Sequence, residues 1–341
     1  MLEILMQYGL FLAKAVTVVL ALGALAAFVF GLSRKGRHAE TLEVKNLNDR
    51  YSSMAEALKR NILAKGELKK FLKKQKTDDK ARRKGKRETR ARVFVLDFRG
   101  DIKASAVASL REEITALLTM ASKDDEVVVR LENAGGLVHE HGLGASQLLR
   151  IKRRDIPLTV AVDKVAASGG YMMACVADRI IAAPFAVIGS VGVLAQVPNF
   201  HRLLDKYGVD FEQIKAGELK RTLTIFGQNT EEDRENLKIQ IEDTHTLFKD
   251  FVAEQRPALD IARISTGEHW YGKRALELQL VDEISTSDDY LLERSEERDV
   301  YTLEYAATRR ISERLAAAVH AVSDKLYFGW WKRANDRRLF D

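Results

Sequence analysis

Residues 157–178, PLTVAVDKVAASGGYMMACVAD, decide the fold class of this chain. The run PLTVAVD (157–163) is short, apolar and rich in β-branched residues, as expected of a strand that is buried on both faces. A turn with two consecutive glycines follows, and then an apolar helix from about Gly169 to Val176. The segment therefore predicts a strand, a tight turn and a helix, with Ser168 at the point where the helix begins.

The same alternation of apolar strands and helices extends in both directions from this segment. Repeated units of this kind predict an α/β domain with a parallel sheet covered by helices, which we place at residues 93–300. The other expected strands are VFVLDF (93–98), EVVVRLE (126–132), RIIAAP (179–184), VIGSVGVLAQ (187–196) and Phe211–Ile214, and the expected helices lie at Val107–Leu118, Gly144–Ile151 and Thr230–Glu254.

Composition and charge exclude several classes of protein. The 341 residues are 46% hydrophobic and 30% charged, which argues against a disordered or fibrous chain. The net charge of the chain is +6, but residues 33–92 alone hold 21 Lys and Arg against 8 Asp and Glu. The domain that follows them is therefore acidic. An acidic domain predicts no nucleic-acid partner. The single cysteine, Cys175, excludes a disulfide framework and a cysteine-rich metal site.

The N-terminal segment, residues 1–32, predicts a transmembrane anchor. Ala15–Leu32 contains no charge, and with the apolar residues before it the stretch reaches the ~20 residues that a spanning helix needs. A cleaved signal peptide and a buried soluble helix are the alternatives, but basic residues follow the run rather than precede it. The positive-inside rule favours a cytoplasmic catalytic domain on a bacterial inner membrane, although many bitopic bacterial enzymes face the other way.

Two further segments flank the domain. Residues 33–92 predict a polar helix and a basic linker, either simply solvated or attracted to anionic lipid headgroups. The lack of interleaved aromatics in this segment disfavours nucleic-acid binding. Residues 301–341 predict a C-terminal amphipathic helix with an aromatic cluster and a basic end, which suits either the membrane interface or packing on the core or on a neighbouring subunit.

Paired glycines follow two of the expected strands, in Asn133-Ala134-Gly135-Gly136 and Ser168-Gly169-Gly170. Sites in α/β folds gather at the carboxyl ends of strands, and paired glycines expose backbone N–H groups, as an oxyanion hole or a phosphate cradle requires. Nucleotide-binding fingerprints are absent from these turns. The elbow motif G-x-S-x-G is absent too, since Ala166 replaces its first glycine. Ser168 is therefore either a helix N-cap or a nucleophile.

A nucleophilic serine needs a base, and the chain offers two kinds. His139 and His141 follow the first glycine pair, but surface or supporting roles suit them equally. A lysine acts as a base only when its pKa falls towards neutrality, which burial beside apolar residues favours. Lys220 lies between Leu219 and Ile225 and is the best candidate, although an ordinary exposed lysine would show the same pattern.

Together these motifs resemble the signal peptide peptidase A family of Ser–Lys peptidases, and its SohB branch in particular, over essentially the whole chain. The resemblance implies a ClpP/crotonase-like fold of stacked ββα units. The segments that carry it, in the family's order and spacing, are DKVAASGGYMMACVAD (163–178), GSVGV (189–193), AGELKRTL (216–223) and TGEHWYGKRALELQLVDEI (266–284).

The resemblance also implies the roles of individual residues. Ser168 matches the nucleophile and Lys220 the general base. The chain departs from the family at Asn133-Ala134, where Ser-Pro is frequent, which affects the rigidity of the turn more than the glycines themselves. The other matched positions are Gly135, Gly136 and Gly169 in the oxyanion hole and Gly189, Ser190, Val191 and Gly192 in the strand that pairs with the substrate.

We therefore expect a membrane-anchored serine endopeptidase that acts on signal-peptide remnants or on misfolded membrane or envelope proteins. The mechanism that the resemblance implies needs no metal and no cofactor. Its expected partners are a peptide or protein substrate, membrane lipid and further copies of itself, because relatives of this length form homo-oligomers in which neighbouring subunits can share a dyad. The alternatives are a non-catalytic membrane scaffold of the same fold and a crotonase-like acyl-CoA enzyme, which would not need Ser168.

Overall fold

The structure is a computed structural model that describes residues 41–83, 90–217, 220 and 223–306, together with Gly9, Lys14, Val16, Thr17 and Val19. Most of the predicted anchor, the end of the basic linker and the C-terminal helix predicted beyond residue 306 lie outside the described residues. Within the described ranges, no helix combines the length and the apolar character needed to cross a membrane.

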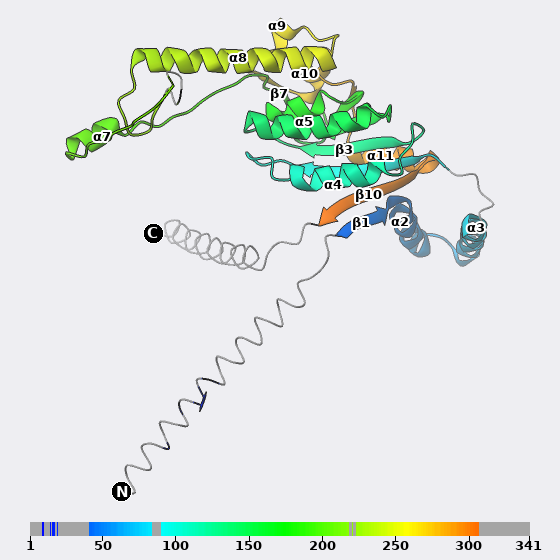
Figure 1. Ribbon diagram of the computed structural model, residues 1–341. Coiled ribbons are helices and arrows are strands. Elements are labelled where there is room, and N and C mark those ends of the chain that lie inside the picture. Colours follow the sequence, from blue (N-terminus) through cyan, green and yellow to red (C-terminus); the bar gives the residue numbers. More distant parts are fainter. Residues whose placement is uncertain are drawn as a thin grey trace, which may run out of the picture. The chain divides into compact units, whose positions relative to one another are not determined.

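The main sheet of the domain has seven strands (Figure 1). The pairs from β10 through β2, β3, β4 and β6 to β9 are all parallel, as the unbroken apolar runs predict. The prediction of a mixed α/β fold is thus confirmed. In spatial order the strands are β1 (Thr41–Asn46), β10 (Asp299–Ala306), β2 (Arg92–Arg99), β3 (Glu126–Glu132), β4 (Leu158–Val162), β6 (Arg179–Ala182) and β9 (Glu283–Ile284).

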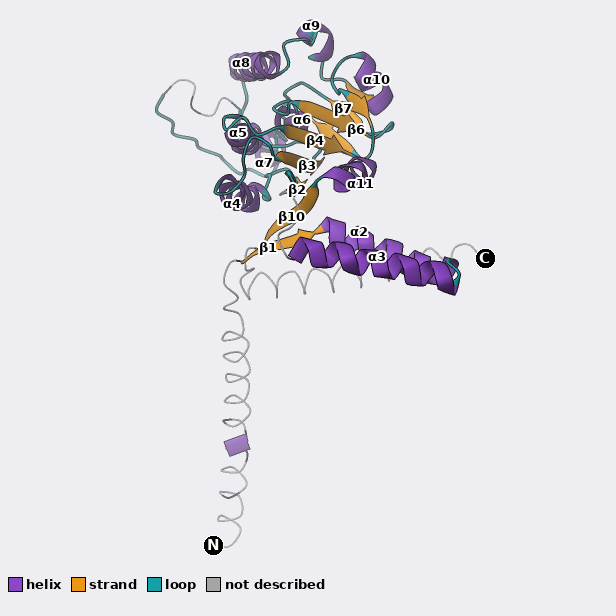
Figure 2. Ribbon diagram, turned by 90° about the vertical axis from the view of Figure 1, so that its right-hand side faces the viewer, coloured by secondary structure: helices purple, strands orange, loops and turns teal. Residues whose placement is uncertain are grey.

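Helices cover both faces of this sheet. Successive side chains of a strand point to opposite faces, so a central strand contributes to two cores. In β2, Phe94 and Leu96 pack into the larger core and Val93 and Val95 into the smaller one. Figure 2 shows α4 and α5 on one side of the sheet and α11 on the other. The covering helices are α4 (Val107–Leu118), α5 (Val138–Lys152) and α6 (Gly169–Ala174) over the larger core, and α11 (Ser287–Glu297) and α2 (Leu47–Ile62) over the smaller.

A second sheet of three short strands brings the Ser168 turn next to the segment that begins at Gly189. It contains β5 (Val165–Ala167), β7 (Val187–Gly189) and β8 (His269–Tyr271), with β5 parallel and β8 antiparallel to β7. β5 follows β4, and β7 follows β6, after only a few residues. A bridge between Asn133 and Ala166 then joins β5 to the end of β3, so the chain on either side of Ser168 lies against the first glycine turn.

The chain between β7 and α8 leaves the packed layers. Residues 194–230, which we call the arm, include the short helix α7 (His201–Lys206), and none of the described arm residues is buried. The arm leads into α8 (Glu231–Gln255), which begins with a capping box between Thr230 and Asp233. The remaining helices are α3 (Lys65–Arg83), α9 (Ile261–Ile264) and α10 (Gly272–Glu277).

Several expected elements differ from the structure. The strand expected at 187–196 ends at Gly189, because Gly189 and Ser190 both have positive φ and interrupt the extended run. Residues 211–214 form no strand and are exposed. At the ends of the domain, β1 lies inside the expected basic extension, and residues 301–306 belong to β10 rather than to a C-terminal helix.

A buried carboxylate and its arginine partner join the starts of two central strands. Arg92, at the start of β2, donates from Nε to Asp125 Oδ1 at 2.9 Å, and the backbone N–H of Ser122 donates to Asp125 Oδ2 at 2.8 Å. Burial would raise the pKa of Asp125, but these hydrogen bonds outweigh burial and hold the pKa at about 2.

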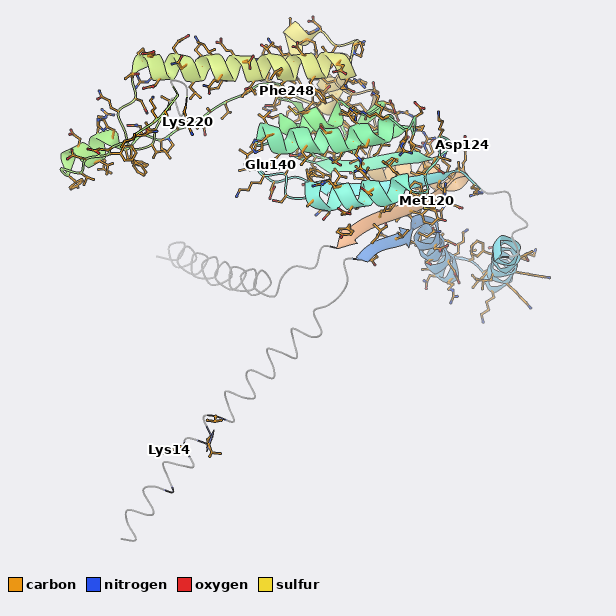
Figure 3. All side chains as sticks on the ribbon, viewed as in Figure 1. Lys14, Met120, Asp124, Glu140, Lys220 and Phe248 are labelled. Atoms are coloured by element: carbon orange, nitrogen blue, oxygen red, sulfur yellow. The ribbon has the colours of Figure 1, made fainter. Side chains whose placement is uncertain are left out.

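We expect Asp125→Asn to lower the free energy of unfolding at pH 7 by about 2 kcal/mol, because the folded state stabilises the carboxylate. A depressed pKa stabilises the fold above the unfolded value of about 3.9 and loses its effect as the pH falls towards 2. Denaturant unfolding at pH 7 and pH 3 should therefore give a smaller difference from wild type at pH 3. Asp124→Asn, in the exposed neighbour, is the control (Figure 3). Equal differences at both pH values would contradict this.

Candidate active site

Ser168 occupies a strained turn between β5 and α6. Its backbone has φ 53° and ψ −120°, a conformation that a non-glycine residue adopts only when the surroundings enforce it. Here its N–H donates to Gly189 O at 2.8 Å, and its carbonyl oxygen accepts from the N–H of Met172 at 3.0 Å. The side chain makes no capping bond to the helix and is partly exposed. Ser168 is thus the N-cap residue of α6 by position, but its hydroxyl does not cap the helix and is left for another role.

The two glycines after Ser168 allow the turn to lie very close to the end of β3. A Cβ atom built on Gly169 would lie 2.4 Å from Cγ of His141, and one built on Gly170 would lie 2.1 Å from the carbonyl oxygen of Asn133. Both distances are shorter than any van der Waals contact allows. Glycine is therefore required at both positions by close packing against the neighbouring turn.

The first glycine turn faces the serine. Gly135 has φ 92°, and a Cβ on it would lie 2.8 Å from Cβ of Ser168 and 2.9 Å from the backbone nitrogen of Gly169. A Cβ on Gly136 would instead meet the carbonyl oxygen of Ile102 at 2.2 Å. The structure thus brings Gly135, Ser168 and Gly169 together, as the sequence predicts.

The N–H groups around the serine differ in availability. Gly135 donates its N–H to Oδ1 of Asn133 at 2.9 Å, so this N–H is already engaged. Among the residues that the structure describes, the N–H groups of Gly136 and Gly169 have no acceptor. Both N–H groups are thus free to donate to another group, and that of Gly169 lies directly after Ser168 in the chain.

The two histidines near the turn make their contacts with groups other than Ser168. His139 is exposed, with Nε2 3.7 Å from Oε1 of Glu140. His141 is buried, and its ring nitrogens lie 2.9 Å from Leu137 O and 3.2 Å from Oδ1 of Asn133. Within the described chain, no hydrogen bond joins either ring to the hydroxyl of Ser168.

Lys220 lies in the arm and is exposed (Figure 3). Its backbone N–H donates to Gly217 O at 3.2 Å, and Ile225 nearby is exposed as well. The expectation that apolar neighbours bury this lysine is therefore wrong for a single chain, because the arm has no core beneath it. Among the described contacts there is none between Lys220 and Ser168.

The segment expected to pair with substrate forms the end of β7 and the residues after it. Gly189 packs closely on Trp270, since a Cβ atom built on Gly189 would lie 2.9 Å from the indole ring. The N–H of Ser190 donates to Glu268 O at 2.6 Å. Val191 is buried, and Gly192 lies beside the chain at 267. The segment is thus held by the chain around β8, next to the serine turn.

The other reactive groups do not form a competing site. Cys175 is fully buried, and burial raises the pKa of its thiol to about 12, so it is no nucleophile at neutral pH. In the described ranges, no three His, Cys, Asp or Glu side chains are placed to hold a metal ion. Sequence reasoning missed the role of the Asn133 side chain, although an Asn two residues before a glycine is a frequent turn signal.

Family models match both halves of the chain. The model described as Peptidase family S49 N-terminal matches residues 3–148, and that described as Peptidase family S49 matches residues 150–301. A solved structure of the 1510-N membrane-bound stomatin-specific protease with a substrate peptide covers 67% of this chain and 98% of its own, at 15% identity and a TM-score of 0.42.

Curated relatives match over most of their length. "Probable protease SohB" of Haemophilus influenzae is 48% identical over 315 residues, which are 89% of each chain. The protein of the same name from Buchnera aphidicola subsp. Acyrthosiphon pisum is 46% identical over 329 residues, or 95% of this chain and 97% of the relative. The resemblance to the SohB branch is thereby confirmed, and the chain belongs to peptidase family S49.

Proposed function

We propose that the chain is a serine endopeptidase in which Ser168 is the nucleophile and Lys220 the general base. The observation that carries this proposal is the strained turn at Ser168, whose uncapped hydroxyl lies beside Gly135 and next to the free N–H of Gly169. Strain of this kind persists where function requires an exposed nucleophile. The pairs β4–β5 and β6–β7 also fit the stacked ββα units of the ClpP/crotonase group.

The reaction that these groups support is acyl transfer to water. Neutral Lys220 takes the proton of the Ser168 hydroxyl, and the serine oxygen attacks the peptide carbonyl. The free N–H groups of Gly169 and Gly136 bind the oxyanion. The leaving amine takes the proton from Lys220, and water then hydrolyses the acyl-enzyme with Lys220 again as the base. No metal or cofactor enters this sequence.

The arm that carries Lys220 has an exposed apolar surface. Its large apolar side chains include Ile214, which is 97% exposed, and Leu194, which is 76% exposed. The arm is nevertheless ordered by contacts within itself. The N–H of Phe200 donates to Ile225 O at 2.7 Å, and the ring of Phe226 contacts that of Phe200. An ordered apolar segment without a core beneath it is typical of a surface that another copy covers. We propose a homo-oligomer in which the arm of one subunit brings Lys220 to Ser168 of its neighbour and desolvates the lysine.

We also propose where the chain lies in the cell. The apolar run Ala15–Leu32 and the basic residues after it support an inner-membrane anchor with the catalytic domain on the cytoplasmic side. Substrates held at or released from the membrane then have the shortest path to the site. We propose signal-peptide remnants and misfolded membrane or envelope proteins as the substrate class.

Replacement of either dyad residue should abolish peptide hydrolysis. In detergent-solubilised full chain, Ser168→Ala and Lys220→Ala are expected to lower kcat about 10³-fold or more. Lys220→Arg should do the same, because a guanidinium keeps the charge but does not lose its proton. Ser146→Ala and Lys215→Ala, at exposed positions, are matched controls. Full activity in the dyad variants, with assembly intact, would favour the non-catalytic scaffold.

Mixing the two inactive chains tests whether subunits share the dyad. Ser168→Ala and Lys220→Ala chains produced together should regain activity at about a quarter of the sites, because some interfaces then combine an intact serine with an intact lysine. Chains that carry both substitutions, mixed with either single variant, are the control. If mixed oligomers form but remain inactive, Lys220 acts within its own chain and the shared dyad is refuted.

A further inference from the structure

Asn133 is a buried polar residue directly after β3, with 1% of its surface exposed. Its backbone is bonded to β5 on both sides, since its N–H donates to Val165 O at 2.9 Å and its carbonyl oxygen accepts from Ala167 N–H at 3.0 Å. The side chain folds over the turn, and Oδ1 accepts the N–H of Gly135 at 2.9 Å. Such a bond closes an Asx turn, so the Asn133 side chain fixes the backbone that faces Ser168.

His141, on the first turn of α5, contacts the side chain of Asn133. The ring is fully buried, and its Nδ1 lies 2.9 Å from Leu137 O. Its Nε2 lies 3.2 Å from Oδ1 of Asn133. Both oxygens only accept hydrogen bonds, so the ring donates to both when each of its nitrogens carries a hydrogen. The same ring fills the space beside Gly169, because a Cβ there would lie 2.4 Å from Cγ of His141.

We propose that Asn133 and His141 are positioning residues that together hold the 133–136 turn and Gly169 in the geometry that binds the oxyanion. This inference rests on the proposed function. Ala134 lacks the fixed φ that a proline would impose, so the turn depends on these side-chain contacts for its rigidity. Neither side chain bonds to Ser168, and both act through the backbone groups that they hold.

The proposal predicts a specific kinetic effect. Oxyanion donors lower the barrier because they are in place before charge develops, so a loosened turn weakens binding of the transition state more than binding of the substrate. Substitutions that break the pair should therefore lower kcat and kcat/KM together and leave KM nearly unchanged. A residue that served only the stability of the fold would change the melting temperature without this pattern.

The test is a double-substitution cycle on the full-length, assembled protein with a fluorogenic peptide. Asn133→Ala and His141→Leu are each expected to lower kcat about 10- to 100-fold, with KM within about twofold of wild type. The double variant should lose no more than the worse single one, because both act through one contact. His141→Gln retains a polar group near the position of Nε2 and should stay within about threefold of wild type. His139→Leu, at the exposed neighbour, is the matched control and should have no effect.

The outcomes separate this proposal from the proposed function. Unchanged kcat in Asn133→Ala, or losses that simply add in the double variant, would overturn the positioning role even if Ser168→Ala is inactive. If His141→Leu does not fold, Asn133→Ala and the rescue by His141→Gln still decide the question. Activity that survives Ser168→Ala would instead refute the proposed function itself.

Discussion

The approach of two glycine-containing turns is the constraint on which the site depends. The turn after β3 and the turn after β5 lie so close that Gly135 and Gly170 have no room for a Cβ atom, and Gly169 has none because His141 of α5 lies against it. This packing follows from the bridge between Asn133 and Ala166, which joins the ends of the two strands. The strained backbone of Ser168 is maintained by the same contacts, because its neighbours on both sides are fixed.

The second sheet turns this local packing into a site. β5 and β7 are parallel, and the N–H of Ser168 donates to Gly189, where β7 ends. The serine therefore lies between the glycine turn on one side and the segment from Gly189 to Gly192 on the other. The general base is the part that these layers do not supply. The arm carries Lys220 away from the core of its own chain. We therefore propose that the active site is complete only at an interface between two copies of the chain.

Much of this arrangement could be predicted from the sequence. The buried strands read as continuous apolar runs, and β3 begins and ends where the sequence predicts, because a sheet covered on both faces admits few polar residues. The paired glycines pointed to the correct turns, and the structure adds a reason that was not predicted, because close packing leaves no room for a Cβ atom. The arm could not be predicted, because its apolar residues resemble a strand until one sees that no partner strand lies beside them. The contact between His141 and Asn133 could not be predicted either, because it joins the end of a strand to a helix through side chains.

The proposed catalysis depends most on Ser168 being a nucleophile that Lys220 activates. The most direct measurement is mass-spectrometric mapping of the adduct that a fluorophosphonate probe forms with the assembled, full-length protein. We predict a single adduct on Ser168 in the wild type and its loss in Lys220→Ala. An adduct on another residue, or labelling of Ser168 that is as fast without Lys220, would contradict this mechanism.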